Sequence, residues 1–407
     1  ALLDVAHDEL LGALAEGRTV LEDPNPGADC RATLAAVRAL GAGVSEAAPG
    51  RWTIDGGRLA EPEDILDLGN SGTGLRLLAG LLAARPVFAV LTGDRSLRRR
   101  PMERIVRPLV AMGASIEARE GVRAPLAVRG GRLRGIDHES PVASAQVKSA
   151  LLLAGLGLAH GRLRLREAAR SRDHTERLFR WSGVALGEED GWLVLPAGER
   201  PQPRSWRVPG DLSAAMFPLV AAAITPGSRV VVAGVGLNPT RTGGLEALRR
   251  MGARIAVSED PIEGPEPVGT VTVEHGPLRP LEVGGAEVPR LIDEIPVLAV
   301  AAACADGTSA FRDVAELRVK ESDRLHGVCD LLRALGVRVE EGTDYFLVHG
   351  AGRLAGARVA ARDDHRIAMA ALVAGCAAEG PVEVDSQEMI ATSDPGFHGM
   401  LAHLKGE

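Results

Sequence analysis

Acidic and basic side chains in this 407-residue chain gather in short segments that stand directly before apolar helical patterns. Examples are Asp293-Glu294, Lys320-Glu321-Ser322-Asp323-Arg324 and Asp364-His365-Arg366. Carboxylates, an ammonium and arginines are together the groups needed to transfer a proton beside a bound anion. A solvated, salt-bridged helix start explains residues 320–324 equally well when that segment is taken alone. Core packing explains Asp364-His365-Arg366 poorly, because an apolar run follows it directly.

Lysine is rare in this sequence. Lys148, Lys320 and Lys405 are the only lysines among 47 Lys and Arg residues. Lys148 and Lys320 both lie in polar segments, where a compact ammonium contacts an anion differently from the planar fork of arginine. We therefore favour a functional role for Lys320, whereas function and chance are balanced for Lys148.

A Gly-rich turn, Asn70-Ser71-Gly72-Thr73-Gly74, also enters a predicted helix. Free backbone N–H groups and the helix dipole attract anions at such a start, and Gly72 lets a phosphate approach the backbone. Many ordinary helix caps have this pattern, and its spacing fits neither a Walker loop nor a dinucleotide fingerprint. Basic residues within 95–101 and in Ser171-Arg172-Asp173 precede other predicted helices and strengthen the prediction of an anion site.

These segments belong to a unit that recurs six times, at a spacing of roughly 65–80 residues. Each copy has an Ala/Leu-rich helix, a β-rich run, a polar stretch and an amphipathic helix. Five of the amphipathic helices end near a glycine, namely Gly41, Gly113, Gly183, Gly252 and Gly336. The alternation predicts the α/β (α+β) class, with the first helix of each copy at the centre and sheets outside. Three copies precede residue 210 and three follow, which predicts two domains, 1–209 and 210–407.

Composition narrows the class of protein. Hydrophobic residues make up 45% and charged residues 25%, as in soluble globular proteins, and the net charge of −7 gives no reason to expect nucleic acid as a partner. The apolar helical patterns are too short to span a membrane.

The four cysteines form no CxxC pair, which fits a reducing, cytoplasmic setting. No metal-ligand spacing and no GxSxG turn appears. The Pro/Gly/acid-rich stretch 259–268 is expected to be an exposed loop.

Eight segments, taken together and in order, resemble the 5-enolpyruvylshikimate-3-phosphate (EPSP) synthase family. They are LGNSGTGLR from Leu68, GDRSLRRRPM from Gly93, SAQVKSALLLAGL from Ser144, SRDHTERL from Ser171, PGDLSAAMF from Pro209, LIDEIPVLA from Leu291, ELRVKESDRL from Glu316 and DDHRIAMA from Asp363. The resemblance implies two similar domains, each of three repeated units with inner helices and outer sheets (an inside-out α/β barrel). It also implies helix starts that face a cleft.

The same resemblance implies transfer of the enolpyruvyl group from phosphoenolpyruvate to the 5-hydroxyl of shikimate 3-phosphate, with release of phosphate. No metal or organic cofactor is expected, and the enzyme is expected to be a monomer. The implied catalytic residues are Asp293, Lys320 and Glu321. The implied phosphoenolpyruvate-binding residues are Gly72, Arg100, Arg324 and Arg366. Those implied for shikimate 3-phosphate are Ser144, Ala145, Gln146 and Ser171, together with Asp293 and Lys320. The herbicide glyphosate is expected in the phosphoenolpyruvate subsite, where Gly72 leaves room for it.

The first unit departs from the family pattern. The family's opening motif is close to GDKSISHRALLLGALAEG, and only its end matches here, from Leu10. Leu2 stands where a phosphate-binding lysine is expected, Leu3 where a serine is expected, and His7 where an arginine is expected. The strand that normally precedes them is expected to be missing. Thr392 stands where some members carry another lysine.

Three interpretations follow from this departure. The chain is a working synthase with an altered N-terminus, a relative with weak or no synthase activity, or an enolpyruvyl transferase that acts on a UDP-sugar. Residues 2–6 are expected to extend the first amphipathic helix backward, because leucines recur on one face.

Overall fold

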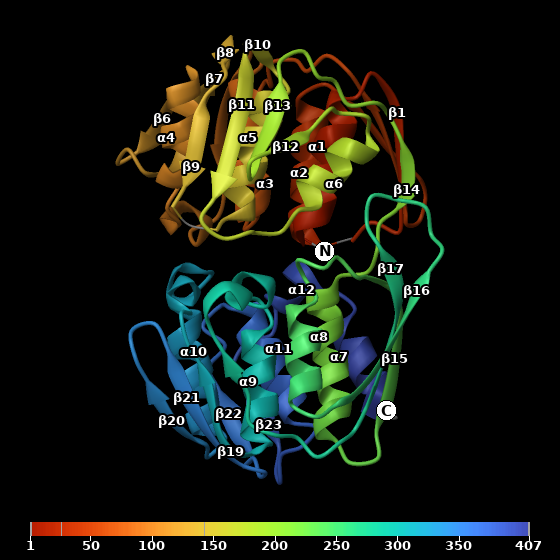
Figure 1. The fold of residues 1–407 in the computed structure, drawn as a ribbon, viewed down its shortest axis with the longest axis vertical. Coiled ribbons are helices and arrows are strands. Elements are labelled where there is room, and N and C mark those ends of the chain that lie inside the picture. The colour runs from red at the N-terminus through yellow and green to blue at the C-terminus, as the bar shows by residue number, and fades with distance from the viewer. Residues whose placement is uncertain (1, 26, 142, 406–407) are drawn as a thin grey trace. The chain divides into compact units, whose positions relative to one another are not determined.

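A computed structural model describes residues 2–405 of the chain, apart from residues 26 and 142. The chain divides into two compact units, which we describe separately. The N-terminal unit comprises Leu2–Pro209 and the short segment Glu263–Glu266, and the C-terminal unit comprises Gly210–Ile262 and the chain from Pro267 onward. In Figure 1 the strands of each unit lie around its helices.

Among its described residues, the N-terminal unit has three four-stranded sheets with one shared topology. Their strand orders are β14-β1-β3-β2, β4-β5-β7-β6 and β9-β11-β13-β12. In each sheet the first two strands pair in parallel, and a hairpin adds two antiparallel strands. The strands are β1 (Gly17–Glu22), β2 (Gly43–Ala48), β3 (Arg51–Gly56), β4 (Leu66–Asp67), β5 (Phe88–Thr92), β6 (Ser115–Arg119), β7 (Arg123–Arg129), β9 (Asp137–Ser140), β11 (Arg162–Glu167), β12 (Gly187–Glu189), β13 (Trp192–Pro196) and β14 (Ser205–Arg207), and β8 (Leu133–Arg134) pairs with β10 (Leu158–His160).

The C-terminal unit repeats this topology in its middle sheet, β18-β19-β21-β20, while the described strands of its other sheets are β15-β17-β16 and β22-β23. The strands are β15 (Arg229–Gly236), β16 (Arg254–Asp260), β17 (Val268–Glu274), β18 (Glu282–Val283), β19 (Asp306–Phe311), β20 (Arg338–Glu341), β21 (Phe346–Ala351), β22 (Ala357–Val359) and β23 (Val382–Val384). The strand order that these sheets share shows that the repeat in the sequence corresponds to a repeated structural unit.

The helices follow the same repeat. The first helices are α1 (Leu2–Leu14), α3 (Gly72–Ala83) and α5 (Ala145–Gly155) in one unit, and α7 (Leu212–Ile224), α9 (Ile295–Ala303) and α11 (His365–Ala374) in the other. The second helices are α2 (Ala28–Ala39), α4 (Glu103–Met112), α6 (His174–Trp181), α8 (Gly243–Arg250) and α10 (Arg324–Ala334), and the chain continues through α12 (Ile390–Ser393) and α13 (Phe397–Lys405). The described residues also form the short 3₁₀ helices η1 (Leu97–Arg99), η2 (Gly285–Arg290) and η3 (Ala315–Val319).

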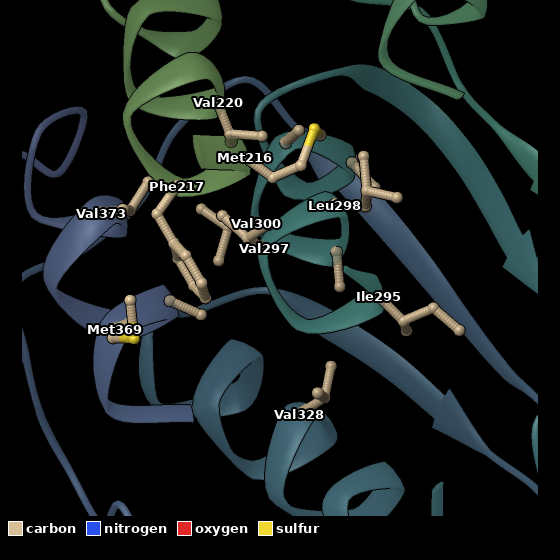
Figure 2. Packing of buried hydrophobic residues seen from close by; sticks show 14 of the residues in the cluster. Met216, Phe217, Val220, Ile295, Val297, Leu298, Val300, Val328, Met369 and Val373 are labelled. Carbon is tan, nitrogen blue, oxygen red and sulfur yellow. The ribbon is translucent and has the colours of Figure 1, made fainter. Parts of the chain in front are cut away.

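The first helices form the core of each unit, as the sequence predicts. Every residue of α9 is buried, and Figure 2 shows Phe217 of α7, Val297 of α9 and Met369 of α11 packing together in the C-terminal unit. Few aromatic side chains are available, so Ala, Leu and Val fill this space and allow the helices to approach closely. The outcome is an α/β fold of inner helices and outer sheets.

Glycines end the five amphipathic helices because the chain there turns through a left-handed conformation. Gly41, Gly113, Gly183, Gly252 and Gly336 all have positive φ, between 80° and 107°. A side chain would be strained at such a helix end, and glycine is not. The recurring glycine in the sequence is therefore a helix stop, and it sends the chain into the following strand.

A close approach between α3 and α5 depends on another glycine. A Cβ atom placed on Gly80 would lie 2.0 Å from the carbonyl oxygen of Ala150, so only glycine permits this spacing. The two helices pack along their length, which brings the starts of both helices to the same end of the N-terminal unit.

Two predictions about the rest of the chain have different outcomes. The backward extension of the first helix is confirmed, since α1 begins at Leu2. The side chains of Leu2, Leu3 and Thr392 lie outside the described part of the structure, whereas His7 is buried. The prediction of an exposed loop at 259–268 is wrong at both ends, because β16 continues to Asp260 and the buried Val268 begins β17. It is also wrong at Glu266, which is 8% exposed and lies 2.8 Å from His174 of α6. In the part of the chain that the structure describes, none of the helices combines the length and the apolarity that a membrane crossing requires.

Candidate active site

The candidate residues form two groups, one in each unit. The carboxylate cluster, in the C-terminal unit, consists of Asp293, Lys320, Glu321, Arg324, Asp364 and Arg366. The helix-start cluster, in the N-terminal unit, consists of Asn70, Gly72, Thr73, Arg76, Arg100, Ser144, Ala145, Gln146, Lys148, Glu167 and Ser171. Both groups lie at the starts of helices.

Helix caps fix the backbone of the carboxylate cluster. The side chain of Asp323 accepts a hydrogen bond from the backbone N–H of His326 at 3.0 Å, which caps α10. Asp364 caps α11 in the same way, accepting from the N–H of Arg366 at 3.0 Å. Aspartate is favoured at these positions because its carboxylate satisfies a helix N–H that has no partner within the helix. Asp323 and Asp364, which lie in polar segments found in the sequence, are therefore helix caps.

Arg324 is the centre of the carboxylate cluster, and its side chain is 1% exposed. Its Nε donates to Oδ2 of Asp364 at 2.9 Å, and its Nη1 lies 3.4 Å from Oδ1 of Asp293. Its Nη2 donates to Glu321. Burial alone would lower the pKa of the Arg324 guanidinium, but the surrounding carboxylates outweigh burial and place that pKa above its usual range. Arg324 is a permanent buried cation that holds three carboxylates in place.

Three side chains of the carboxylate cluster are partly exposed to solvent, namely Lys320, Glu321 and Arg366. Lys320 and Glu321 have side chains 25% and 23% exposed. The ammonium of Lys320 lies 3.4 Å from Oδ1 of Asp293. Arg366 donates to the backbone oxygen of Asp293 at 3.0 Å. An ammonium, two carboxylates and a second arginine thus meet at one place, which gives the cluster both proton donors and acceptors beside positive charge.

His365 lies between two residues of the carboxylate cluster, Asp364 and Arg366. The side chain is buried, and burial, helped by the neighbouring Arg366, lowers the pKa of the imidazole to about 4. The ring is therefore neutral at physiological pH and adds no charge to the site.

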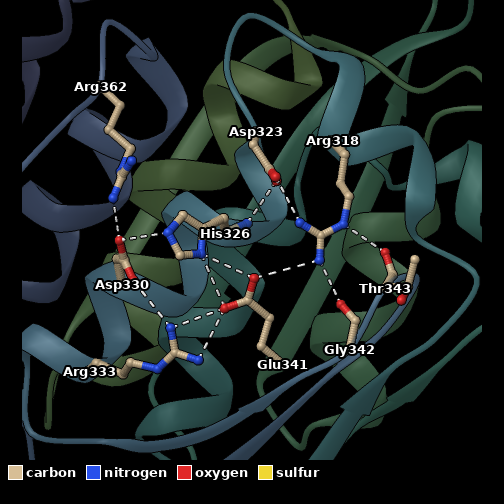
Figure 3. A network of polar contacts seen from close by, with 9 residues as sticks. All are labelled: Arg318, Asp323, His326, Asp330, Arg333, Glu341, Gly342, Thr343 and Arg362. Carbon is tan, nitrogen blue, oxygen red and sulfur yellow. Dashed lines mark hydrogen bonds and ion pairs between the residues drawn. The ribbon is translucent and has the colours of Figure 1, made fainter.

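Arg318 positions the segment that carries Lys320 and Glu321. Figure 3 shows its guanidinium between the backbone oxygens of Gly342 and Thr343, which accept at 2.6 and 2.7 Å, and the carboxylate of Asp323, at 2.7 Å. Asp323 is the cap of α10, so Arg318 joins that helix start to the β20–β21 hairpin. Arg318 lies in the ELRVKESDRL segment, but its residue type and position there predicted no role for it.

A second buried network supports the start of α9. Ser213 donates to Glu294, and Arg241 donates to Ser213 and, at 3.1 Å, to Asp211. Ser213, Glu294 and Arg241 are all buried. The conformation of Asp293, which directly precedes Glu294, therefore depends on contacts with α7 and with residues near α8.

In the helix-start cluster, Gly72 lies against two arginines. A Cβ atom placed on Gly72 would be 2.8 Å from Nη1 of Arg100 and 2.9 Å from Nη1 of Arg76. Arg100 donates to the side chain of Asn70 at 2.6 Å, and Asn70 donates to Asp94 at 2.7 Å. The glycine keeps both guanidinium groups close to the backbone at the start of α3, where an anion is favoured.

Gln146 connects α5 to α3. Its side-chain oxygen accepts from Arg76 at 2.7 Å, and its side-chain nitrogen donates to Thr73 at 2.7 Å. Arg76 also donates to the carbonyl of Gly72 at 3.1 Å. Ala145 is the first residue of α5, so its backbone belongs to the same helix start. Thr73 and Arg76 lie in the LGNSGTGLR segment, and their contacts with Gln146 place them in the helix-start cluster, which the sequence did not predict.

Ser144 and Ser171 share one carboxylate, that of Glu167. Oε1 of Glu167 accepts from the backbone N–H of Ser144 at 3.1 Å, and Oε2 accepts from the hydroxyl of Ser171 at 2.9 Å. Lys148 lies 3.0 Å from the same carboxylate. Its side chain is 3% exposed, so Lys148 is a buried ion-pair partner within the protein. Glu167 lies only four residues before Ser171, but it stands outside the motif that begins there, and no role was predicted for it.

The two units, with inner helices, outer sheets and polar groups at helix starts, define the enolpyruvyl transferase class. An enolpyruvyl transferase, NikO from Streptomyces tendae, has the same fold with a TM-score of 0.79, over 99% of this chain and 93% of that one, at 20% identity. The EPSP synthase of Acinetobacter baumannii superposes with a TM-score of 0.86 and 41% identity, covering 98% of this chain and 92% of that one.

Sequence comparison identifies the family within this class. The family model for EPSP synthase (3-phosphoshikimate 1-carboxyvinyltransferase) matches residues 7–401. A 3-phosphoshikimate 1-carboxyvinyltransferase of Gloeobacter violaceus is 51% identical, covering 98% of this chain and 94% of the relative. One from Pelotomaculum thermopropionicum is 50% identical, covering 97% and 92%. The chain belongs to the EPSP synthase family.

Proposed function

We propose that this chain transfers the enolpyruvyl group of phosphoenolpyruvate to the 5-hydroxyl of shikimate 3-phosphate and releases phosphate. One observation carries the proposal: Asp293, Lys320 and Glu321 meet around the buried cation Arg324. This arrangement supplies the two proton-transfer groups that the reaction needs, together with positive charge for an anionic substrate.

The reaction adds a proton to the methylene carbon of phosphoenolpyruvate and joins the 5-oxygen to its neighbouring carbon. Phosphate then leaves that carbon as the methyl group gives up a proton, which restores the double bond. We assign Asp293 to the proton of the 5-hydroxyl and Glu321 to the proton of the methyl group. The ammonium of Lys320 stabilises negative charge beside both.

The remaining candidates bind the two substrates. We assign Gly72, Arg100, Arg324 and Arg366 to phosphoenolpyruvate, and Ser144, Ala145, Gln146 and Ser171, with Asp293 and Lys320, to shikimate 3-phosphate. Arginine suits the phosphate and carboxylate of phosphoenolpyruvate because its donors form a fork. No metal or organic cofactor enters the proposal. We further propose that residues 1–209 and 210–407 are its domains, and that the enzyme is a cytoplasmic monomer.

Phosphate release from phosphoenolpyruvate and shikimate 3-phosphate tests the proposal. We expect steady release by the wild-type chain and a loss of about 100-fold or more in Asp293→Asn. Asp190→Asn is the matched control, because Asp190 is an exposed turn residue with positive φ, which asparagine also adopts. Release by the wild type only with UDP-N-acetylglucosamine as acceptor would favour a UDP-sugar transferase, and release with neither acceptor would contradict the proposal.

A further inference from the structure

Glu167 contacts both serines that we assign to the binding of shikimate 3-phosphate. Its carboxylate accepts from the N–H of Ser144 at 3.1 Å, from the N–H of Ser171 at 3.2 Å and from the hydroxyl of Ser171 at 2.9 Å. Ser144 precedes α5, and Ser171 lies in the turn between β11 and α6. One carboxylate at the end of β11 therefore connects two segments that are separate in sequence.

We propose that Glu167 is the positioning residue of the phosphate subsite for shikimate 3-phosphate, an inference that rests on the function proposed above. It sets the separation and orientation of Ser144 and Ser171 and does not itself contact the substrate. A carboxylate suits this task because its two oxygens accept several hydrogen bonds at once. An amide of the same shape accepts on one side only.

The positive charge of Lys148 allows the carboxylate of Glu167 to lie close to a bound phosphate. Its ammonium lies 3.0 Å from Oε2 of Glu167 and 2.7 Å from Oε1 of Glu176, with all three side chains buried or nearly so. Burial alone would lower the pKa of Lys148, but Glu176 and Glu167 outweigh it and raise that pKa. Lys148 thus remains charged and offsets the charge of Glu167, which would otherwise repel the phosphate.

Neighbouring contacts hold this buried group in place. The hydroxyls of Ser149 and Thr175 lie 2.6 Å apart, which links α5 to α6 directly beside Lys148 and Glu176. Ser171 has only one hydroxyl proton, and in this structure Glu167 accepts it. For Ser171 to donate to the substrate, that proton turns from Glu167 to the phosphate. The two backbone N–H groups and Lys148 continue to hold Glu167.

Steady-state kinetics of Glu167→Gln test the inference. We expect the KM for shikimate 3-phosphate to rise about tenfold or more, because the amide loses charge-assisted contacts to both segments. The KM for phosphoenolpyruvate and kcat should change by less than about threefold, since those contacts come from other residues. Glu167→Asp keeps the charge but shortens the side chain, so an intermediate rise is expected.

Glu139→Gln is the matched control, because Glu139 lies on β9 of the same sheet with its side chain 58% exposed. Equal increases in both KM values, or an unchanged KM for shikimate 3-phosphate, would overturn the inference. Urea unfolding of each variant identifies loss of fold, and if Glu167→Gln does not fold, Glu167→Asp decides by the same criterion.

Calorimetric titration with shikimate 3-phosphate alone separates this inference from the proposed function. If the wild type binds shikimate 3-phosphate without turning it over, the proposed catalysis fails. Weaker binding by Glu167→Gln would then still support the positioning role, and equal binding would refute it.

Discussion

Arg324 and Asp364 form a two-contact ion pair inside the C-terminal unit. Nε of Arg324 lies 2.9 Å from Oδ2 of Asp364, and Nη2 lies 3.3 Å from Oδ1. The side chains are 1% and 0% exposed. Asp364 also caps α11 and accepts from Ser322 at 3.0 Å. One carboxylate therefore links the starts of α10 and α11 and fixes the arginine around which the catalytic candidates meet.

Asp364→Asn should destabilise the protein by about 3 kcal/mol, because it leaves a buried guanidinium short of one charge partner. This expected loss of stability is at the low end for a broken buried ion pair, since Asp293 and Glu321 still contact Arg324. Urea unfolding measures the change. Asp363→Asn is the control, because Asp363 is the exposed neighbour. Equal stability of the two variants would show that the ion pair contributes little.

Glu321→Gln should lower kcat about 100-fold or more, because the amide cannot take up or return a proton. The KM for phosphoenolpyruvate should change much less. Single-turnover phosphate release measures the chemical step directly. Glu340→Gln, on an exposed strand with its side chain 47% exposed, should retain full activity. A kcat for Glu321→Gln close to that of the wild type would remove Glu321 from the proton-transfer role.

Gly72→Ala should raise the KM for phosphoenolpyruvate and weaken inhibition by glyphosate more strongly. The added methyl group would lie 2.8 Å from Nη1 of Arg100 and 2.9 Å from Nη1 of Arg76, so both guanidinium groups must move. Inhibition curves at several phosphoenolpyruvate concentrations measure both effects. Gly131→Ala is the control, because a Cβ there meets nothing within 4 Å. Unchanged glyphosate inhibition in Gly72→Ala would contradict the assignment of Gly72 to this subsite.

His365 should make the protein less stable in mild acid. Burial lowers the pKa of the folded imidazole to about 4, whereas an unfolded histidine titrates near 6.5. Between these values the unfolded chain binds the proton more tightly, so the free energy of unfolding falls as the pH drops below about 6.5. The contribution of His365 is about 2 kcal/mol between pH 7 and pH 5.

Urea unfolding of His365→Gln at pH 7 and pH 5 tests this prediction, since the variant should lose about that much of the pH dependence. His403→Gln, at an exposed position of α13, serves as the control and should keep the wild-type pH dependence. If the free energy of unfolding changes between pH 7 and pH 5 by the same amount in His365→Gln as in the wild type, His365 is not the group responsible.

The sequence by itself determined the repeat, the α/β class and the family. These features depend on local patterns: apolar periodicity selects helix or strand, and a glycine ends five of the amphipathic helices, where the chain takes a positive φ. The family motifs likewise lie within single short segments, so Asp293, Lys320, Glu321 and the arginines could be predicted as site residues without any knowledge of packing.

Tertiary structure decided which groups touch. Gln146 meets Arg76 across 70 residues of sequence because Gly80 allows α3 and α5 to approach. Lys148 is an ion-pair partner of Glu167 and Glu176 because α5, β11 and α6 converge there. Glu266 was expected in an exposed loop, but it is buried against His174. Each case depends on contacts between distant segments, and the desolvation and pairing of a charged group are determined only when packing brings those segments together.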